Sequence, residues 1–252
     1  MGHGAVGWHN VSVSMQNIYD DEVFFAGYQA MRDARSGINE AVKQPAFLAL
    51  LPPLDDAVVV DLGCGDGQLC RVLVDKGAKS VLGVDHSARM FALAEKRTVD
   101  DRVRYLKSFA EQVTLPASSV DLVTSSLALH YVADLPPLLE RLATWLRPGG
   151  WFVASMEHPV VTAAPELGSH PCIVDNYASE GERDTTWYVE GVVKYHRRIS
   201  TIINGVIDAG LAIRRVIEPT PTTESLVQRP NLDHYGRLPA VLILAATKPL
   251  PR

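Results

Sequence analysis

The chain has 252 residues, of which 47% are hydrophobic and 21% charged, which suits one large globular domain better than two full domains. Its formal net charge of −5 gives no general attraction to nucleic acid or to anionic membranes. We find neither an apolar run long enough to span a membrane nor a secretory signal pattern. We therefore expect a cytoplasmic protein that acts on a small molecule, without nucleic-acid or membrane partners. The composition does not indicate an oligomeric state.

The three cysteines, Cys64, Cys70 and Cys172, are odd in number and form no CxxC pair. Cys64 and Cys70 stand six residues apart around a glycine-rich segment, which is a poor spacing for metal ligands. We interpret all three as thiols in a reducing cytosol and expect no metal site.

The N-terminal quarter divides into a tail and a helical region. Residues 1–18 show no periodicity, and we expect them to be mobile. Phe24, Tyr28 and Met31 then follow a helical spacing, and a second helical pattern covers residues 38–51 before two prolines end it. We expect residues 19–53 to form a helical lid.

The rest of the chain alternates between strand and helix patterns. Residues 58–62 are short, β-branched and almost wholly apolar, as buried parallel strands are. Further strands are predicted at residues 80–84, 103–106, 120–124 and 151–156, and two more at 213–217 and 240–246. The pattern predicts an α/β fold with a doubly wound, mostly parallel seven-stranded sheet in a single domain, residues 19–252. Residues 158–195 contain a segment rich in Pro, Gly and Thr, which we expect to form a substrate-side insertion after the fifth strand.

The first strand ends in a glycine-rich turn, which is where open α/β sheets bind ligands. An acidic residue, Asp85, ends the second strand and can accept hydrogen bonds from ribose hydroxyls. A dinucleotide site has the pattern GxGxxG, but here the third glycine, Gly67, comes one residue early and Gln68 holds its place. A nucleoside ligand without a pyrophosphate therefore fits better, and no P-loop is present.

The segment VDLGCGDG at residues 60–67 resembles the first motif of class I S-adenosylmethionine-dependent methyltransferases, of the bacterial small-molecule type. Asp85 matches the ribose-binding acid of that family, and the segments at 108–111, 125–131 and 146–150 resemble later motifs. Ser108 departs from the family's usual Asp, so the adenine would rely on the backbone NH of Phe109 or Ala110. The resemblance implies S-adenosyl-L-methionine as cofactor and S-adenosyl-L-homocysteine as product. The expected cofactor-binding residues are Tyr19, Tyr28, Asp61, Gly63, Cys64, Gly65, Asp85, His86, Met90, Ser108, Phe109, Ala110 and Ser126.

Methyl transfer from a sulfonium is an in-line displacement, in which the protein aligns the acceptor and removes a proton where needed. His130 follows the fourth strand and His158 the fifth, so each is a candidate base or a packing histidine. Tyr195 and His196 precede a late helix and could lie over the substrate, or form a solvated helix start. Arg32 and Asn39 could join the lid to the cofactor.

The predicted function is methyl transfer to an O or N atom of a small metabolite or natural product. Two alternatives remain open from the sequence. One is a module that binds S-adenosylmethionine without catalysis, and the other is a nicotinamide-dependent oxidoreductase on the same fold.

Overall fold

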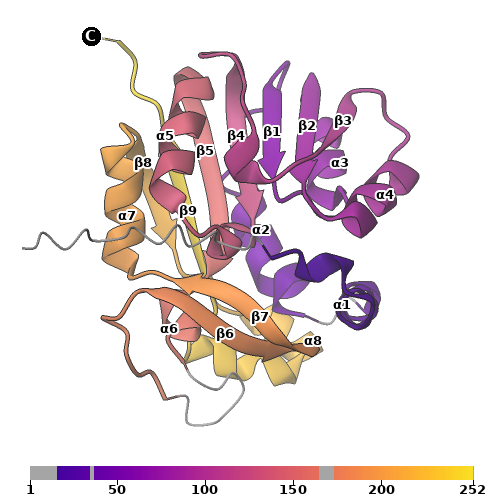
Figure 1. Ribbon diagram of the computed structural model, residues 1–252, viewed down its shortest axis with the longest axis vertical. Coiled ribbons are helices and arrows are strands. Elements are labelled where there is room, and N and C mark those ends of the chain that lie inside the picture. Colours follow the sequence, from indigo (N-terminus) through magenta and orange to yellow (C-terminus); the bar gives the residue numbers. More distant parts are fainter. Residues whose placement is uncertain (1–15, 35–36, 165–172, 252) are drawn as a thin grey trace, which may run out of the picture.

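A seven-stranded sheet forms the centre of the molecule (Figure 1). The computed structural model describes residues 16–34, 37–164 and 173–251. In the sheet, the strand order is β3-β2-β1-β4-β5-β9-β8. The strands are β1 (Val58–Leu62), β2 (Ser80–Asp85), β3 (Val103–Lys107), β4 (Val120–Ser126), β5 (Leu146–Glu157), β8 (Ala212–Ile217) and β9 (Val241–Thr247).

The first five strands run parallel, and β9 is antiparallel to both of its neighbours, β5 and β8. The chain enters the sheet near its middle at β1 and adds β2 and β3 toward one edge. It then crosses back to β4, on the other side of β1. This reversal of strand order creates a crevice beyond the carboxyl ends of β1 and β4. The mostly parallel, doubly wound sheet predicted from the sequence is confirmed.

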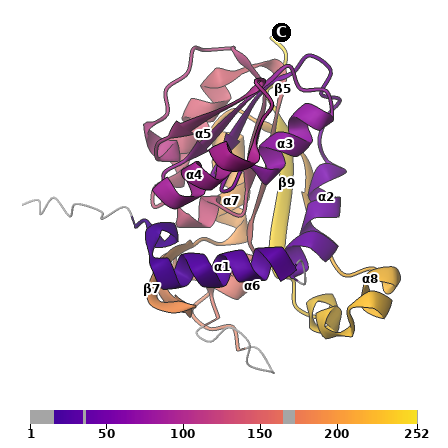
Figure 2. The ribbon, with the colours of Figure 1, turned by 90° about the vertical axis from the view of Figure 1, so that its right-hand side faces the viewer.

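Helices cover both faces of the sheet (Figures 1 and 2). Leucines of α5 and Ile202 and Val206 of α7 pack with one face, while Phe47 of α2 and Leu73 of α3 pack with the other. The helices are α1 (Glu22–Ala34), α2 (Gln44–Leu48), α3 (Gln68–Asp75), α4 (Ala88–Arg97), α5 (Leu135–Trp145), α6 (Pro159–Thr162), α7 (Ile199–Asp208) and α8 (Thr223–Gln228). A π-helical turn, η2 (Asn39–Lys43), leads into α2, and the short 3-10 helices are η1 (Ile18–Asp20), η3 (Ala110–Gln112), η4 (Leu129–Tyr131) and η5 (Pro230–Gly236).

Local sequence explains where the central elements begin. The β-branched run of β1 is buried on both faces, as expected for an inner parallel strand. The Ser87 hydroxyl accepts a hydrogen bond from the Met90 NH and so caps α4. Gly67 adopts a left-handed φ of 74° at the start of α3, a conformation that glycine adopts without a steric penalty.

The remaining elements gather at one end of the sheet (Figures 1 and 2). Here β6 (Gly181–Trp187) and β7 (Val189–His196) form an antiparallel hairpin, accompanied by α1, α6 and α8. The sequence predicted an insertion in this region but not the hairpin. The alternative that Tyr195 and His196 form a solvated helix start is wrong, because both lie on β7 and His196 is fully buried. Residues 1–15 and 165–172, which include parts of the expected tail and insertion, lie outside the described residues.

Candidate functional site

A cavity of about 560 Å³ lies where the strands β1, β2, β4 and β5 end. Its walls come from the glycine turn, the N-terminal helices, the β6–β7 hairpin and the segment around η5. Every residue that the sequence assigned to cofactor binding lines this cavity. These residues are Tyr19, Tyr28, Asp61, Gly63, Cys64, Gly65, Asp85, His86, Met90, Ser108, Phe109, Ala110 and Ser126. Of the four catalytic candidates, His130 and Tyr195 also line it.

The glycine turn after β1 is closely packed at Gly63 and open at Gly65. The NH groups of Gly63 and Cys64 both donate to the Val84 carbonyl, at 2.8 and 2.9 Å. A Cβ on Gly63 would lie 2.3 Å from the Ala128 Cβ, whereas a Cβ on Gly65 would meet nothing within 4 Å. Gly65 therefore presents bare backbone to the cavity, where a ligand can approach closely.

The Asp85 carboxylate is fixed by backbone donors on both sides. Its Oδ2 accepts from the Gly65 NH at 2.8 Å and its Oδ1 from the Ser87 NH at 2.9 Å. Burial raises the pKa of Asp85. Because each carboxylate oxygen has a second lone pair, the group can still accept hydrogen bonds from a pair of hydroxyls.

An aromatic pair stands beside Asp85. The His86 imidazole stacks on the Phe109 ring, with 4.5 Å between the centroids and 17° between the planes. The Ser108 hydroxyl donates to the Phe109 carbonyl at 3.1 Å, and the Ser108 NH donates to the Asp85 carbonyl at 3.0 Å. Together with the buried Met90, these residues form a wall suited to a flat ring.

Asp61 of β1 and Lys43 of η2 line the cavity as well. Burial raises the pKa of Asp61 to about 6, although its carboxylate accepts from the Thr124 hydroxyl at 2.8 Å. The Lys43 ammonium donates to the Ser126 hydroxyl at 2.6 Å, and burial lowers its pKa to about 8. Lys43 is not among the site residues predicted from the sequence. The available signal was a lysine next to Val42 and four residues before Phe47 on the apolar side of a helical segment.

The N-terminal helices are attached to the cofactor side by polar contacts. Asp20 accepts from the Ser87 hydroxyl at 2.6 Å and from the NH groups of Ala88 and Arg89 at 3.1 and 3.0 Å. Arg32 donates to Glu40 at 2.7 Å and to the Gln68 side chain.

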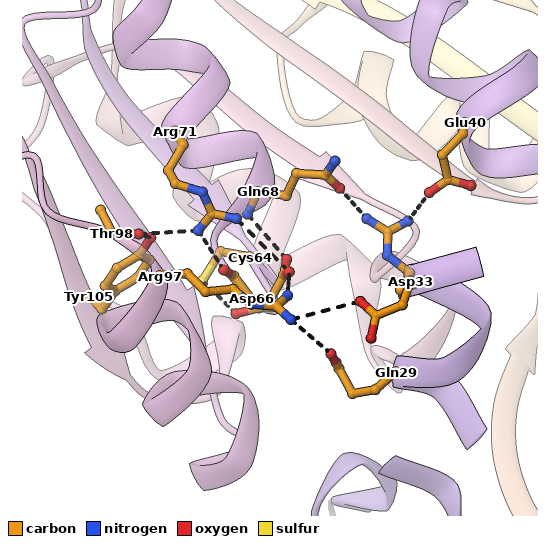
Figure 3. Close-up of polar contacts among 12 residues, drawn as sticks. Gln29, Asp33, Glu40, Cys64, Asp66, Gln68, Arg71, Arg97, Thr98 and Tyr105 are labelled. Carbon is orange, nitrogen blue, oxygen red and sulfur yellow. Dashed lines mark hydrogen bonds and ion pairs between the residues drawn. The ribbon is translucent and has the colours of Figure 1, made fainter. Parts of the chain in front are cut away.

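Figure 3 shows these Gln68 and Glu40 contacts beside a second group of contacts, in which Arg97 reaches Asp66, Asp33 and Gln29. These contacts join α1 to the start of α3 and to α4. Asn39 donates to Glu40 at 2.9 Å. Arg32 therefore bridges to Gln68 of the protein framework, whereas Asn39 contacts its neighbour Glu40 within the N-terminal helical segment.

Four aromatic side chains in mutual contact line the cavity. Tyr19 makes edge contacts with Tyr28 and Tyr131, with centroid distances of 5.2 and 6.0 Å. The Trp187 ring of the hairpin lies 6.0 Å from the Tyr28 ring. These four residues, which we call the aromatic wall, come from η1, α1, η4 and β6. Burial raises the pKa of Tyr19, Tyr28 and Tyr131, so all three phenols stay neutral at physiological pH.

Glu157 and His130 lie near the end of β5, on the far side of β4 from the glycine turn. Burial would raise the pKa of Glu157, but attraction to His130 and Lys194 outweighs it and the pKa is lowered. The Lys194 ammonium donates to Glu157 Oε1 at 2.7 Å, while Oε2 is buried without a partner among the described residues. Burial lowers the pKa of His130 to about 4, so its imidazole is neutral at pH 7.

The other two predicted catalytic histidines are turned away from the cavity. His158 is 1% exposed, pairs with Glu218 at 2.8 Å and accepts from the Val160 NH at 3.1 Å. His196 is fully buried between the Thr162 hydroxyl, at 2.7 Å, and the Tyr177 carbonyl, at 3.0 Å. Neither residue lines the cavity. Successive side chains of a strand point to opposite faces, so Tyr195 reaches the cavity and its neighbour His196 does not.

Neither a membrane span nor a metal cluster is found in the described part of the chain. No helix there is long and apolar enough to cross a membrane. The same residues contain no group of three or more His, Cys, Asp or Glu side chains arranged to hold a metal ion.

Comparison with known proteins identifies relatives that match most of the chain and others that match its core. A family model described as a methyltransferase domain matches residues 60–154. A Haemophilus influenzae protein, named only as uncharacterized, is 33% identical over 218 residues, which cover 81% of this chain and 86% of the relative. The crystal structure of an S-adenosylmethionine dependent methyltransferase from Mesorhizobium loti superimposes with a TM-score of 0.78 at 39% identity, covering 84% of this chain and all of that one.

A further relative matches the core alone. The trans-aconitate 2-methyltransferase of Mycolicibacterium gilvum is 39% identical over 94 residues, which cover 37% of this chain and 35% of that enzyme. The match therefore leaves most of both chains unaligned.

Proposed function

The chain belongs to the S-adenosylmethionine-dependent methyltransferases, and we propose that it transfers the methyl group to an O or N atom of a small molecule. The observation that carries this proposal is the position of Asp85 and the open backbone of Gly65 at one end of a cavity of about 560 Å³. A cavity of this size suits a cofactor together with a small acceptor.

The residues around the turn fit the parts of the cofactor. We assign the ribose hydroxyls to Asp85, the adenine ring to the wall of His86, Met90 and Phe109, and the adenine edge to the backbone NH of Phe109 or Ala110. When bound, S-adenosylmethionine supplies an activated methyl group on a sulfonium, and the protein's task is to align the acceptor with it.

The amino-acid end of the cofactor fits the space beside Gly63, Gly65 and Lys43. The Lys43 ammonium lines the cavity, and within the described residues it donates one hydrogen bond, to the Ser126 hydroxyl, although an ammonium has three donors. We assign it to the cofactor carboxylate. Asp61 lies on the same side and is suited to the cofactor's ammonium group.

We propose that His130 and Tyr195 orient the acceptor. Both line the cavity near Glu157, at the end of β5. The low pKa of His130 argues against a strong base and in favour of a hydrogen-bonding role. Alignment then accounts for most of the catalysis, with the aromatic wall excluding water from the methyl group.

The nicotinamide-dependent alternative is disfavoured by the glycine spacing. Gly67 already sits against the Tyr105 hydroxyl, since a Cβ there would lie 2.0 Å from it, and Gln68 follows with the start of α3. The position where a dinucleotide site needs its third glycine is therefore a helical side chain.

Turnover distinguishes an enzyme from a silent binding module. Purified protein is incubated with methyl-labelled S-adenosylmethionine and pools of small amines, phenols and alcohols, and S-adenosylhomocysteine is measured with and without each pool. We expect at least one pool to accelerate its formation. Cofactor binding without any acceptor-dependent product, across every pool, would favour the silent module.

A further inference from the structure

The charged side chains around the cavity are unequal in sign. Six carboxylates line it, those of Glu40, Asp61, Asp66, Asp85, Glu111 and Glu157. In the described part of the chain, the lysines and arginines of the lining are Arg32 and Lys43. Three of the carboxylates are ion-paired, Glu40 with Arg32, Asp66 with Arg97 and Glu157 with Lys194. Bound S-adenosylmethionine adds one net positive charge, and the carboxylates of Asp61, Asp85 and Glu111 still outnumber the charges of Lys43 and the cofactor. Such a cavity attracts a cationic acceptor and repels an anionic one.

Glu157 is the carboxylate placed to meet the acceptor. Asp61 and Asp85 end β1 and β2 on the cofactor side, whereas Glu157 ends β5, on the other side of β4. Its side chain is 22% exposed and lines the cavity, while its partner Lys194 is 3% exposed and does not. Within the described residues Oε2 has no hydrogen-bond partner, so this carboxylate keeps an acceptor beyond its ion pair with Lys194.

The aromatic wall adds a second feature that favours a cation. Electron-rich ring faces attract ammonium groups, and Trp187 already has the Lys194 ammonium 5.3 Å from its ring centroid. Tyr19, Tyr28 and Tyr131 line the same region of the cavity. During methyl transfer the positive charge moves from sulfur to the acceptor. The ring faces of the aromatic wall would therefore stabilise that charge on the acceptor as well.

The side chains near Glu157 are less suited to bind a carboxylate acceptor or to deprotonate a hydroxyl acceptor. Lys194 is paired with Glu157, and the Arg197 guanidinium donates to the carbonyls of Val132 and Ala133. Neither cation is therefore free to hold a carboxylate. A hydroxyl must lose its proton during attack, and the neutral His130 has a pKa of about 4, which makes it a weak base.

We propose that the methyl acceptor is a primary or secondary amine on an apolar or aromatic framework, bound by Glu157 and the aromatic wall. This inference rests on the methyltransferase function proposed above. The amine first gives its ammonium proton to water. Its lone pair then attacks the methyl carbon, so that the N–C bond forms as the C–S bond breaks and the electron pair passes to sulfur. The methylated ammonium carries the positive charge and releases a proton to solvent afterwards.

Three probes of matched shape test this proposal: phenethylamine, 2-phenylethanol and phenylacetate. Each is titrated by calorimetry into the full-length protein saturated with S-adenosylhomocysteine. We expect phenethylamine to bind at least tenfold more tightly than either of the others. Glu157→Gln should reduce that preference to less than threefold without changing the affinity for S-adenosylhomocysteine. Glu190→Gln, which removes an exposed carboxylate from the same hairpin, should leave the preference unchanged.

A paired variant covers the case in which Glu157→Gln folds poorly because it leaves Lys194 buried beside a neutral side chain. Glu157→Gln combined with Lys194→Met removes both charges together and should also abolish the preference for the amine. Equal or tighter binding of phenylacetate, no binding of phenethylamine, or a preference that survives the paired substitution would overturn the inference. Failure of S-adenosylhomocysteine itself to bind would instead overturn the proposed function.

Discussion

Gly63 and Gly65 stand two residues apart in the same turn, and we expect alanine to affect them in different ways. Both have left-handed φ angles, 74° and 55°, which cost alanine about 1–2 kcal/mol each. Gly63→Ala also drives its Cβ to within 2.3 Å of the Ala128 Cβ, and overpacking of this kind adds about 1–3 kcal/mol. Gly65→Ala meets open space. We therefore expect a loss of stability of about 2–5 kcal/mol for Gly63→Ala and about 1–2 kcal/mol for Gly65→Ala.

Cofactor binding should be weakened by Gly65→Ala, because the alanine methyl at position 65 projects into the cavity. Thermal unfolding of the two variants should show the larger fall in Tm for Gly63→Ala, at about 2–4 °C per kcal/mol for a chain of this size. Calorimetry at a temperature where Gly65→Ala is folded should show S-adenosylhomocysteine binding at least tenfold more weakly than to the unsubstituted protein. Unchanged affinity in Gly65→Ala, or a larger loss of stability there than in Gly63→Ala, would refute this reading of the turn.

Three further predictions concern single side chains. The folded pKa of His130, about 4, lies below the ordinary value of 6.5, so the unfolded chain binds more protons between these values and stability is lost as pH falls from about 6.5 to 4. His130→Asn should remove about 3 kcal/mol of that pH dependence in denaturant titrations; an unchanged profile would contradict the assignment. Lys43→Met should weaken S-adenosylhomocysteine binding about 5- to 100-fold without lowering the Tm of the free protein, and unchanged affinity would remove Lys43 from the cofactor site. Asp20→Ala should destabilise the protein by about 1–2 kcal/mol and speed hydrogen exchange in η1 and α4, and unchanged exchange would show that this cap does not hold the N-terminal segment.

The cofactor side could be predicted from sequence because it depends on local patterns. A buried strand, a glycine turn and an acidic residue at the next strand end define the geometry within about 30 residues of chain, as in other nucleotide-binding α/β folds. The positions of Gly63, Gly65 and Asp85 in the cavity lining agree with that reasoning. The doubly wound, mostly parallel arrangement also follows, because strands joined by helical crossovers leave few topologies.

The acceptor side could not be predicted because its contacts join distant segments. Glu157 and Lys194 are 37 residues apart in sequence, and nothing in either segment indicates that the two side chains pair. The orientation of Tyr195 toward the cavity and of His196 away from it depends on which face of β7 packs inward. No strand was predicted in this segment, so there was no basis in the sequence for choosing between the two faces. The position of His158, paired with Glu218 from beyond β8, is likewise set by tertiary packing.

The most direct test of the central claim is titration calorimetry of the full-length protein with S-adenosylhomocysteine, run beside NAD under the same conditions. The geometry of the Gly65 turn and Asp85 predicts micromolar binding of S-adenosylhomocysteine and no measurable binding of NAD. Binding of NAD without S-adenosylhomocysteine would contradict the account and point to dehydrogenase chemistry on the same fold.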